Sequence, residues 1–256
     1  MPLVVFNLLN MIESIVKIFP TPNDLAMNFA AEMVRMINES AKDKKLFTIA
    51  LSGGSTPELL FRLLAEKFGE TVPWHYVHFF WGDERCVPPA DQESNFGMTS
   101  RTLLSKITIP EENIHRIKGE TDPAYEAIRY GEEISRFTSI RNGIPCFNLV
   151  ILGLGEDGHT ASIFPGHLDL FDSEKNCEIA SHPVTGQKRI TITGMVINNA
   201  DNVTFLVTGE KKAQVVEKLF KKNPVSLNYP ATYVVPIFGL LSWFIDKEAA
   251  WYVSGD

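Results

Sequence analysis

Apolar and polar positions alternate along the chain with two different periods, and the changes between them predict strands followed by helices. The run "IVKIF" at 15–19 predicts a short strand. Thr21 and Pro22 follow it as the expected N-cap and first residue of a helix. Apolar residues then recur at every fourth position, at Leu25, Phe29, Met33 and Ile37. This spacing predicts that one face of the helix is buried.

The same alternation continues to the end of the chain. Further strands are predicted at 45–51, 76–81, 147–152, 189–193 and 203–208. Further helices are predicted at 56–68, 94–105, 123–140 and 210–220, and 241–253 predicts a last helix or strand. Strands that alternate with helices form a mostly parallel sheet with helices on both faces. Because ligands bind beyond the carboxyl ends of such strands, we expect functional residues after positions 51, 81, 152 and 208.

The length and composition are typical of one globular domain. The 256 residues are 45% hydrophobic and 21% charged, so we expect a single domain over 1–256, with residues 1–10 as an N-terminal extension. A net charge of −7 argues against a nucleic-acid-binding surface. No apolar run is long enough to span a membrane, and the first residues lack the basic start and cleavage site of a secretory signal. Three widely spaced cysteines favour a reducing compartment, so a cytoplasmic location is expected.

The segment "LSGGSTP" at 51–57 has the composition of an anion-binding turn. Gly53 and Gly54 let the backbone approach a ligand closely. The N–H groups that follow, including that of Ser55, lie at a predicted helix N-terminus, whose partial positive charge favours an anion. A tight turn with a Ser or Thr cap explains the same residues equally well. The segment lacks the third glycine of a dinucleotide fingerprint and the lysine of a nucleotide P-loop.

Two other strand ends carry charged or titratable side chains. Asp83 and Arg85, in "WGDER", directly follow a predicted strand, although a solvated turn would use the same residues. The segment "ILGLGEDGHTASIFPG" at 151–166 contains Asp157 and His159. A histidine can move a proton near neutral pH, and a neighbouring aspartate can orient its ring. The alternative is a helix-capping aspartate with an incidental histidine.

Two cations lie where a bound anion would explain them. Lys212 begins a predicted helix, where a positive charge is unfavourable unless it neutralises an anion, although a solvated lysine pair is the simpler alternative. Arg189 begins the strand at 189–193 and offers a second, forked contact to a phosphate.

Taken together, these segments resemble the 6-phosphogluconolactonase family, which is related in fold to the glucosamine-6-phosphate deaminases. The resemblance covers nearly everything from Ile15 to the C-terminus. It implies a single Rossmann-like α/β domain of the sugar-phosphate isomerase/deaminase type, with a mostly parallel sheet and helices on both faces. Its markers are "LSGGSTP", "WGDER", "GLGEDGHTASIFPG", "RITIT", "FLVTGEKKA" and "LSWFIDKEAA".

The resemblance also implies roles for the residues that match these markers. It implies hydrolysis of 6-phospho-D-glucono-1,5-lactone to 6-phospho-D-gluconate, a reaction of the oxidative pentose phosphate pathway, by a hydrolase that requires no cofactor and no metal. The substrate phosphate is expected at Gly53, Gly54 and Ser55, with Arg189 and Lys212. The catalytic residues are expected to be His159, Asp157, Arg85 and Asp83, of which Asp83 matches the base of the deaminases.

Two positions favour the lactonase over the deaminase. The deaminases carry a glutamate immediately before the Pro-Gly pair that follows their "DGH" motif, where this chain has Phe164. They also carry a tyrosine where this chain has Arg85. A non-catalytic sugar-phosphate sensor is a third hypothesis. We expect a small sugar phosphate as the only partner, with no nucleic acid and no membrane, and a monomer or small homo-oligomer.

Overall fold

The computed structural model describes residues 4–6 and 14–253, and its centre is a seven-stranded sheet. Six strands are parallel, and an N-terminal strand pairs antiparallel at one edge. In spatial order the strands are β1 (Val4–Phe6), β2 (Ser14–Phe19), β12 (Leu240–Asp246), β11 (Asn202–Val207), β8 (Leu149–Leu152), β3 (Phe47–Leu51) and β4 (Val77–Trp81). The predicted α/β fold class with a mostly parallel sheet is therefore confirmed.

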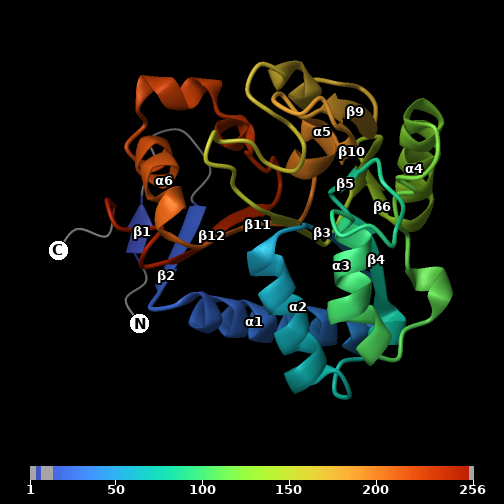
Figure 1. The fold of residues 1–256 in the computed structure, drawn as a ribbon. Helices are drawn as coiled ribbons and strands as arrows, with labels where there is room; N and C mark the ends of the chain where they lie inside the picture. The colour runs from blue at the N-terminus through green and yellow to red at the C-terminus, as the bar shows by residue number, and fades with distance from the viewer. Residues whose placement is uncertain (1–3, 7–13, 254–256) are drawn as a thin grey trace.

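Helices cover both faces of this sheet (Figure 1). They are α1 (Pro22–Lys42), α2 (Ser55–Phe68), α3 (Asn95–Thr102), α4 (Pro123–Phe137), α5 (Gly194–Asn198) and α6 (Ala213–Phe220). The start of α1 is the one that the sequence predicts, because the Thr21 side chain accepts a hydrogen bond from the Asp24 N–H at 3.1 Å. In Figure 1, α1 and α2 lie on one side of the sheet and α5 and α6 on the other.

A second, antiparallel sheet lies beside the first. It has the order β5 (Asp83–Arg85), β10 (Lys188–Ile192) and β9 (Cys177–Ser181), and a separate hairpin joins β6 (Ser139–Arg141) to β7 (Ile144–Cys146). The predicted strand at 189–193 therefore exists but lies outside the parallel sheet. The helix predicted at 123–140 ends at Phe137. The segment at 241–253, for which the sequence allowed a helix or a strand, contains the parallel strand β12.

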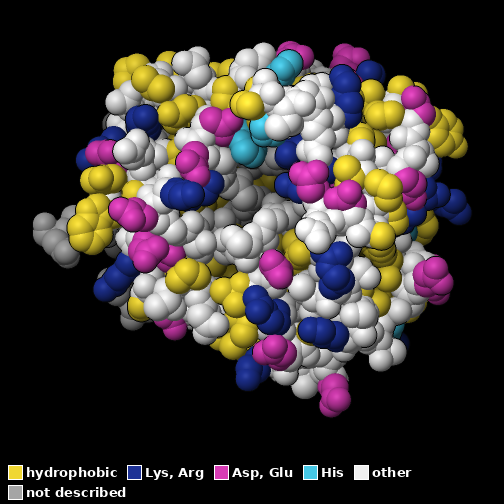
Figure 2. Space-filling view, viewed as in Figure 1, with side chains coloured by type: hydrophobic (Ala, Val, Ile, Leu, Met, Phe, Trp, Pro, Cys, Tyr) yellow, Lys and Arg dark blue, Asp and Glu magenta, His cyan; other side chains and the backbone are white. Residues whose placement is uncertain are grey.

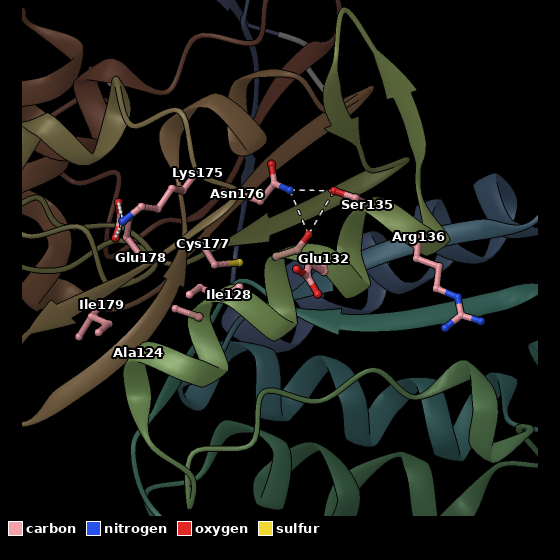
Figure 3. Close-up of a pocket in the computed structure, with 12 residues that line it drawn as sticks. Ala124, Ile128, Glu132, Ser135, Arg136, Lys175, Asn176, Cys177, Glu178 and Ile179 are labelled. Atoms are coloured by element: carbon pink, nitrogen blue, oxygen red, sulfur yellow. Dashed lines mark hydrogen bonds and ion pairs between the residues drawn. The ribbon is translucent and has the colours of Figure 1, made fainter.

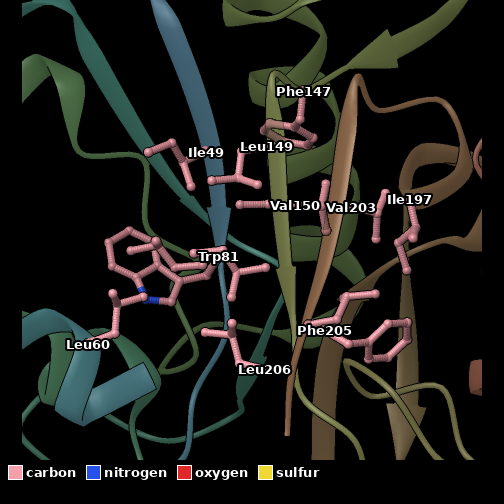
Figure 4. Close-up of a cluster of buried hydrophobic side chains, with 14 of the residues drawn as sticks. Ile49, Leu60, Trp81, Phe147, Leu149, Val150, Ile197, Val203, Phe205 and Leu206 are labelled. Atoms are coloured by element: carbon pink, nitrogen blue, oxygen red, sulfur yellow. The ribbon is translucent and has the colours of Figure 1, made fainter. Parts of the chain in front are cut away.

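The core is continuous through the central strands. Every residue of β3, β4 and β8 is buried, as expected for strands covered on both faces. Figure 4 shows the side chains of these strands and of β11, with Leu60 of α2 on one side and Ile197 of α5 on the other. This packing holds the carboxyl ends of the strands rigidly along one edge of the sheet.

A buried polar chain joins β4 to α4. His78 Nδ1 lies 2.9 Å from His115 Nε2, and His115 Nδ1 lies 2.8 Å from Glu133 Oε1. Burial, followed by the positive charge of Arg129, lowers the pKa of His115 to about 4. The Glu133 carboxylate alone would favour a charged ring, but it also pairs with Arg129, which offsets its charge. Burial, followed by the charge of His115, also lowers the pKa of His78, so both rings are neutral at pH 7.

Part of the predicted N-terminal extension has a place in the fold. Residues 4–6 form β1, which pairs with β2 at the edge of the main sheet, and the rest of 1–10 lies outside the described residues. One domain over 1–256 stays a prediction. None of the helices in the described ranges has the length and apolar character needed to cross a bilayer.

Candidate active site

The carboxyl ends of the central strands surround a cavity of about 200 Å³. Figure 2 shows a hollow near the centre of this face, with histidine, basic and acidic side chains around it. All four segments predicted from the strand ends contribute to the cavity. Its lining residues are Ser52, Gly53, Gly54, Asp83, Arg85, Asn95, Gly153, Leu154, Gly155, His159, Ala161, Arg189 and Lys212.

The turn after β3 meets the cavity with its glycines. Gly54 has φ +103°, a conformation that favours glycine, and α2 begins directly after it. Gly53 is in contact with Asn95, because a Cβ on Gly53 would lie 1.9 Å from the Asn95 Oδ1. Ser55 is the first residue of α2, is exposed, and is not among the lining residues. The two glycines therefore line the cavity, whereas Ser55 does not.

His159 and Asp157 form a hydrogen-bonded pair. His159 Nδ1 lies 2.6 Å from Asp157 Oδ1, and the same oxygen accepts the His159 backbone N–H at 3.2 Å. Burial acts to raise the pKa of Asp157, but its hydrogen bonds with His159 and the charge of the ring together hold that pKa below its ordinary value. An ionised Asp157 fixes the proton on Nδ1 and leaves Nε2 free to accept another.

Gly155 makes this pair possible. A Cβ on Gly155 would lie 2.1 Å from His159 Nδ1 and 2.5 Å from Asp157 Oδ1. The Gly155 N–H also donates to the His159 backbone oxygen at 2.8 Å, which closes the loop. A side chain at this position would therefore separate the histidine from its carboxylate.

Phe164 forms the wall behind the histidine. It is 1% exposed, and its ring centroid lies 4.8 Å from that of His159. The Arg189 guanidinium lies 5.6 Å from the same ring, within range of a cation–π contact. Phe164 thus supports the imidazole and one cation of the cavity with an apolar surface that itself exchanges no proton.

Two arginines face each other across β5 and β10. The register places Arg85 opposite Arg189. Burial, followed by the charge of Arg85, lowers the pKa of Arg189. Arg85 Nη1 donates to the Glu93 carbonyl at 2.6 Å, but the Nε atoms of both arginines are buried and have no hydrogen-bond partner among the described residues. Since like charges that face each other repel, an anion in the cavity would stabilise this arrangement.

Lys212 is the third cation that lines the cavity. It ends the short 3₁₀ turn η5 (Glu210–Lys212) and directly precedes α6. Burial lowers its pKa, and the neighbouring Glu156 and Asp157 carboxylates oppose that shift. A half-buried ammonium at a helix start, inside the cavity, is consistent with the predicted contact to a phosphate.

Glu84 has a structural role that the sequence analysis did not assign. Its carboxylate accepts the backbone N–H groups of Arg85, Asn95 and Phe96, each at 2.8 Å, and the Ser94 hydroxyl at 3.0 Å. Burial raises its pKa, while these backbone hydrogen bonds favour the charged form. Glu84 thereby fastens β5 to the N-terminus of α3.

Asp83 is held by partners that the sequence analysis missed. It is 5% exposed, and its Oδ2 accepts the Ser162 hydroxyl at 2.6 Å. The Asn95 Nδ2 donates to the Asp83 carbonyl at 2.9 Å. Ala161, which precedes Ser162, has φ 48°, an unfavourable conformation for a residue with a Cβ. The sequence analysis assigned no role to Asn95, Ala161 or Ser162, because the contacts that Asn95 and Ser162 make with Asp83 appear only in the folded chain.

The family match covers most of the chain. Residues 20–243 match the family of glucosamine-6-phosphate isomerases/6-phosphogluconolactonase. The chain belongs to this family.

Similar proteins include curated 6-phosphogluconolactonases. One from Haemophilus influenzae is 47% identical over 202 residues, which are 78% of this chain and 85% of the relative. One from Aggregatibacter actinomycetemcomitans is 43% identical over 91% of this chain and 97% of the relative. A solved 6-phosphogluconolactonase from Trypanosoma brucei has a TM-score of 0.82 at 27% identity, covering 96% of this chain and 100% of that one.

The other branch of the family shares the fold. A solved monomeric glucosamine-6-phosphate deaminase has a TM-score of 0.76 at 21% identity, covering 93% of this chain and 99% of that one. At this sequence identity the similarity shows a shared fold and nothing about activity. It agrees with the predicted relation in fold between lactonases and deaminases.

A larger hollow lies away from the segments that mark the family, between α4 and β9 (Figure 3). Its volume is about 630 Å³, but several of its polar groups already pair with one another. Asn176 Nδ2 donates to Ser135 Oγ at 2.8 Å, and Lys175 pairs with Glu178 at 3.1 Å. We therefore take the smaller cavity as the candidate active site because of its side chains, although the other hollow is larger. Within 14–253 no cluster of three or more His, Cys, Asp or Glu side chains is arranged to hold a metal ion.

Proposed function

We propose that this protein hydrolyses 6-phospho-D-glucono-1,5-lactone to 6-phospho-D-gluconate in the oxidative pentose phosphate pathway. The observation that carries this proposal is the His159–Asp157 pair, which opens into the same cavity as three cationic side chains. A base and an anion-binding surface within one small cavity suit a phosphorylated ester. The names of the relatives in this family support the same reaction.

The phosphate end of the substrate docks first in this proposal. Gly53, Gly54 and Ser55 offer the backbone of the turn and of the first residue of α2, and Arg189 and Lys212 neutralise the charge. Backbone N–H groups at a helix N-terminus bind phosphate well, and forked guanidinium contacts add direction. Docking at this end fixes the distance from the phosphate to the lactone carbonyl and so presents that carbonyl to the histidine.

The chemical step uses water and the histidine. His159 Nε2 takes a proton from water while the water oxygen bonds to the carbonyl carbon. The carbonyl oxygen gains the negative charge, which Arg85 stabilises. The intermediate then collapses, the bond from the carbonyl carbon to the ring oxygen breaks, and His159 returns its proton to that oxygen. Asp157 holds the ring in the required tautomer and stabilises its charged form, and general base catalysis of this kind contributes ~10²–10⁴-fold.

Asp83 is proposed as a further residue of the site. Its Oδ2 accepts the Ser162 hydroxyl, and its Oδ1 has only a long contact of 3.5 Å with Asn95 Nδ2, so Oδ1 is the oxygen proposed to bind the ligand. Phe164 occupies the position where the deaminases carry a glutamate, and its ring neither accepts nor donates a proton. This difference supports hydrolysis over deamination.

We also propose that the chain acts as a single domain in the cytoplasm, as a monomer or small homo-oligomer without a nucleic-acid partner. Its cysteines support a reducing compartment, since Cys86, Cys146 and Cys177 are all free. The net charge of −7 argues against nucleic acid. Light scattering during size-exclusion chromatography measures the oligomeric state.

The decisive test compares two reactions on the same purified protein. Acid release is measured from freshly made 6-phosphogluconolactone with and without protein, because the lactone also hydrolyses spontaneously. Ammonia release is measured from glucosamine 6-phosphate. We expect acceleration of the first reaction only. Ammonia release without lactone hydrolysis would assign the deaminase, and binding of sugar phosphates without either reaction would assign a sensor.

A further inference from the structure

Asn95 has a side chain whose orientation is fixed by its surroundings. It is the first residue of α3 and is 3% exposed. Its Nδ2 donates to the Asp83 carbonyl at 2.9 Å. Because a carbonyl oxygen can only accept, the amide nitrogen must point to Asp83, and the Oδ1 must point the other way. The backbone of Asn95 is held as well, since its N–H donates to Glu84 at 2.8 Å.

The Oδ1 of Asn95 lies against Gly53 at the cavity wall. A Cβ on Gly53 would lie only 1.9 Å from it, so the space that a side chain would fill at that position is used by the carboxamide. Within the described part of the chain no donor bonds to this oxygen. This oxygen is not among the buried unpaired polar atoms of the described residues, so it is open to the cavity and available to a hydrogen-bond donor on the ligand.

The chemistry of the proposed substrate supplies such donors. A lactone of a sugar acid carries several ring hydroxyl groups, each of which can donate one hydrogen bond. The cations of the cavity, Arg85, Arg189 and Lys212, can serve the phosphate and the carbonyl, but none of them can accept a hydrogen bond. The acceptors that remain on the β5 side are Asn95 Oδ1 and Asp83 Oδ1, whose contact with Asn95 Nδ2 is long at 3.5 Å.

We propose that Asn95 Oδ1 accepts a hydrogen bond from a ring hydroxyl of the substrate, beside a second hydroxyl bound by Asp83. This role rests on the proposed lactonase function and extends it. Asn95 then makes the site selective for polyhydroxylated phospho-lactones over deoxy analogues. Gly53 contributes to the same selection, because only a residue without a side chain leaves room for the carboxamide.

The test compares 6-phosphogluconolactone with its 2-deoxy, 3-deoxy and 4-deoxy analogues. For the unaltered protein we expect kcat/KM to fall about 2- to 12-fold for the analogue that lacks the hydroxyl bound by Asn95, as for loss of one neutral hydrogen bond. Asn95→Ala is expected to lower kcat/KM on the full substrate by a similar factor and to cause no further loss on that one analogue. The ratio between the two substrates thus falls to about 1 in the variant.

Two further variants keep the result interpretable. Gly53→Ala displaces the Asn95 carboxamide without removing it, and any change in phosphate docking is common to all four substrates and cancels in the ratio. We expect the same loss of discrimination. Asn113→Ala is the matched control, since Asn113 is also buried and donates to the carbonyls of His75 and Val77 outside the cavity. It is expected to lower stability and leave the ratio unchanged.

The possible outcomes distinguish a failure of this inference from a failure of the proposed lactonase function. If Asn95→Ala lowered kcat/KM equally on all four substrates, Asn95 would only support the fold of β5 and α3, and the inference would be wrong. Equal rates of the unaltered protein on all four substrates would overturn it too. If the unaltered protein did not accelerate hydrolysis of 6-phosphogluconolactone at all, the proposed function itself would fail.

Discussion

Replacing Gly155 by alanine tests the histidine–aspartate pair without removing any functional group. The new Cβ would lie 2.1 Å from His159 Nδ1 and 2.5 Å from Asp157 Oδ1, well inside van der Waals contact. Gly155 is not among the glycines with positive φ, so the backbone itself tolerates a side chain there. The perturbation is therefore purely steric, and the imidazole must leave the position in which it bonds to Asp157.

The size of the effect follows from what the pair does. In its present place His159 Nδ1 lies 2.6 Å from the carboxylate, which selects the tautomer with Nε2 free. A ring turned away from Asp157 and from the lactone loses its contribution as a general base. We expect kcat to fall ~100-fold or more, which corresponds to about 2.7 kcal/mol of transition-state stabilisation. KM should change little, because the phosphate site lies at other residues.

The assay follows acid release from fresh lactone with a pH indicator, and the spontaneous rate is subtracted. Gly143→Ala is the matched control: Gly143 lies in the β6–β7 turn with φ +79° and no atom within 4 Å of an added Cβ. It should lose ~1 kcal/mol of stability through backbone strain and keep its kcat. A Gly155→Ala protein that folds, as judged by its thermal unfolding, and retains kcat within about threefold of the unaltered protein would refute the role of the pair.

Four further outcomes are expected. His159→Ala should lower kcat by ~100-fold or more with KM nearly intact, and near-normal turnover would remove His159 from the mechanism. Lys212→Ala should mainly raise KM, because phosphate docking is shared by ground and transition states; an unchanged KM would exclude it as a phosphate ligand. Arg85→Ala should mainly lower kcat if this arginine stabilises the oxyanion, whereas an effect confined to KM would assign it to the phosphate together with Arg189. Since the folded pKa of His115 is about 4 against 6.5 for the free side chain, the unfolded chain binds more protons between these values, so the free energy of unfolding should fall as pH drops from about 6.5 to 4. His115→Gln should flatten that slope in urea titrations, and an unaltered slope would place the titration elsewhere.

Much of the fold could be predicted from local pattern. The period of apolar residues and the Thr21 cap predict α1, and continuous apolar runs predict β3 and β8 as buried strands. The order of strands and helices predicts the parallel sheet, and the sheet in turn predicts the edge at which functional residues meet. Each of these features depends on residues close together in the chain, where hydrogen bonding and periodicity act directly.

The site was predictable to the extent that each segment carries its own signal. The spacing of Asp157 and His159, and the two glycines before α2, are local patterns with a chemical meaning. The position of Arg189 opposite Arg85 was not predictable, because β10 leaves the parallel sheet and pairs antiparallel with β5. The pattern of apolar and polar residues in a strand does not determine which strand pairs with it.

The sequence by itself determined most of the elements, the class of fold and the candidate residues of the proposed site. Tertiary structure alone decided which of them share one cavity, and it added Asn95 against Gly53 and Ser162 against Asp83. Those contacts join residues 42 and 79 positions apart. Side-chain packing between distant segments depends on the whole folded chain, so no local pattern of residues encodes it.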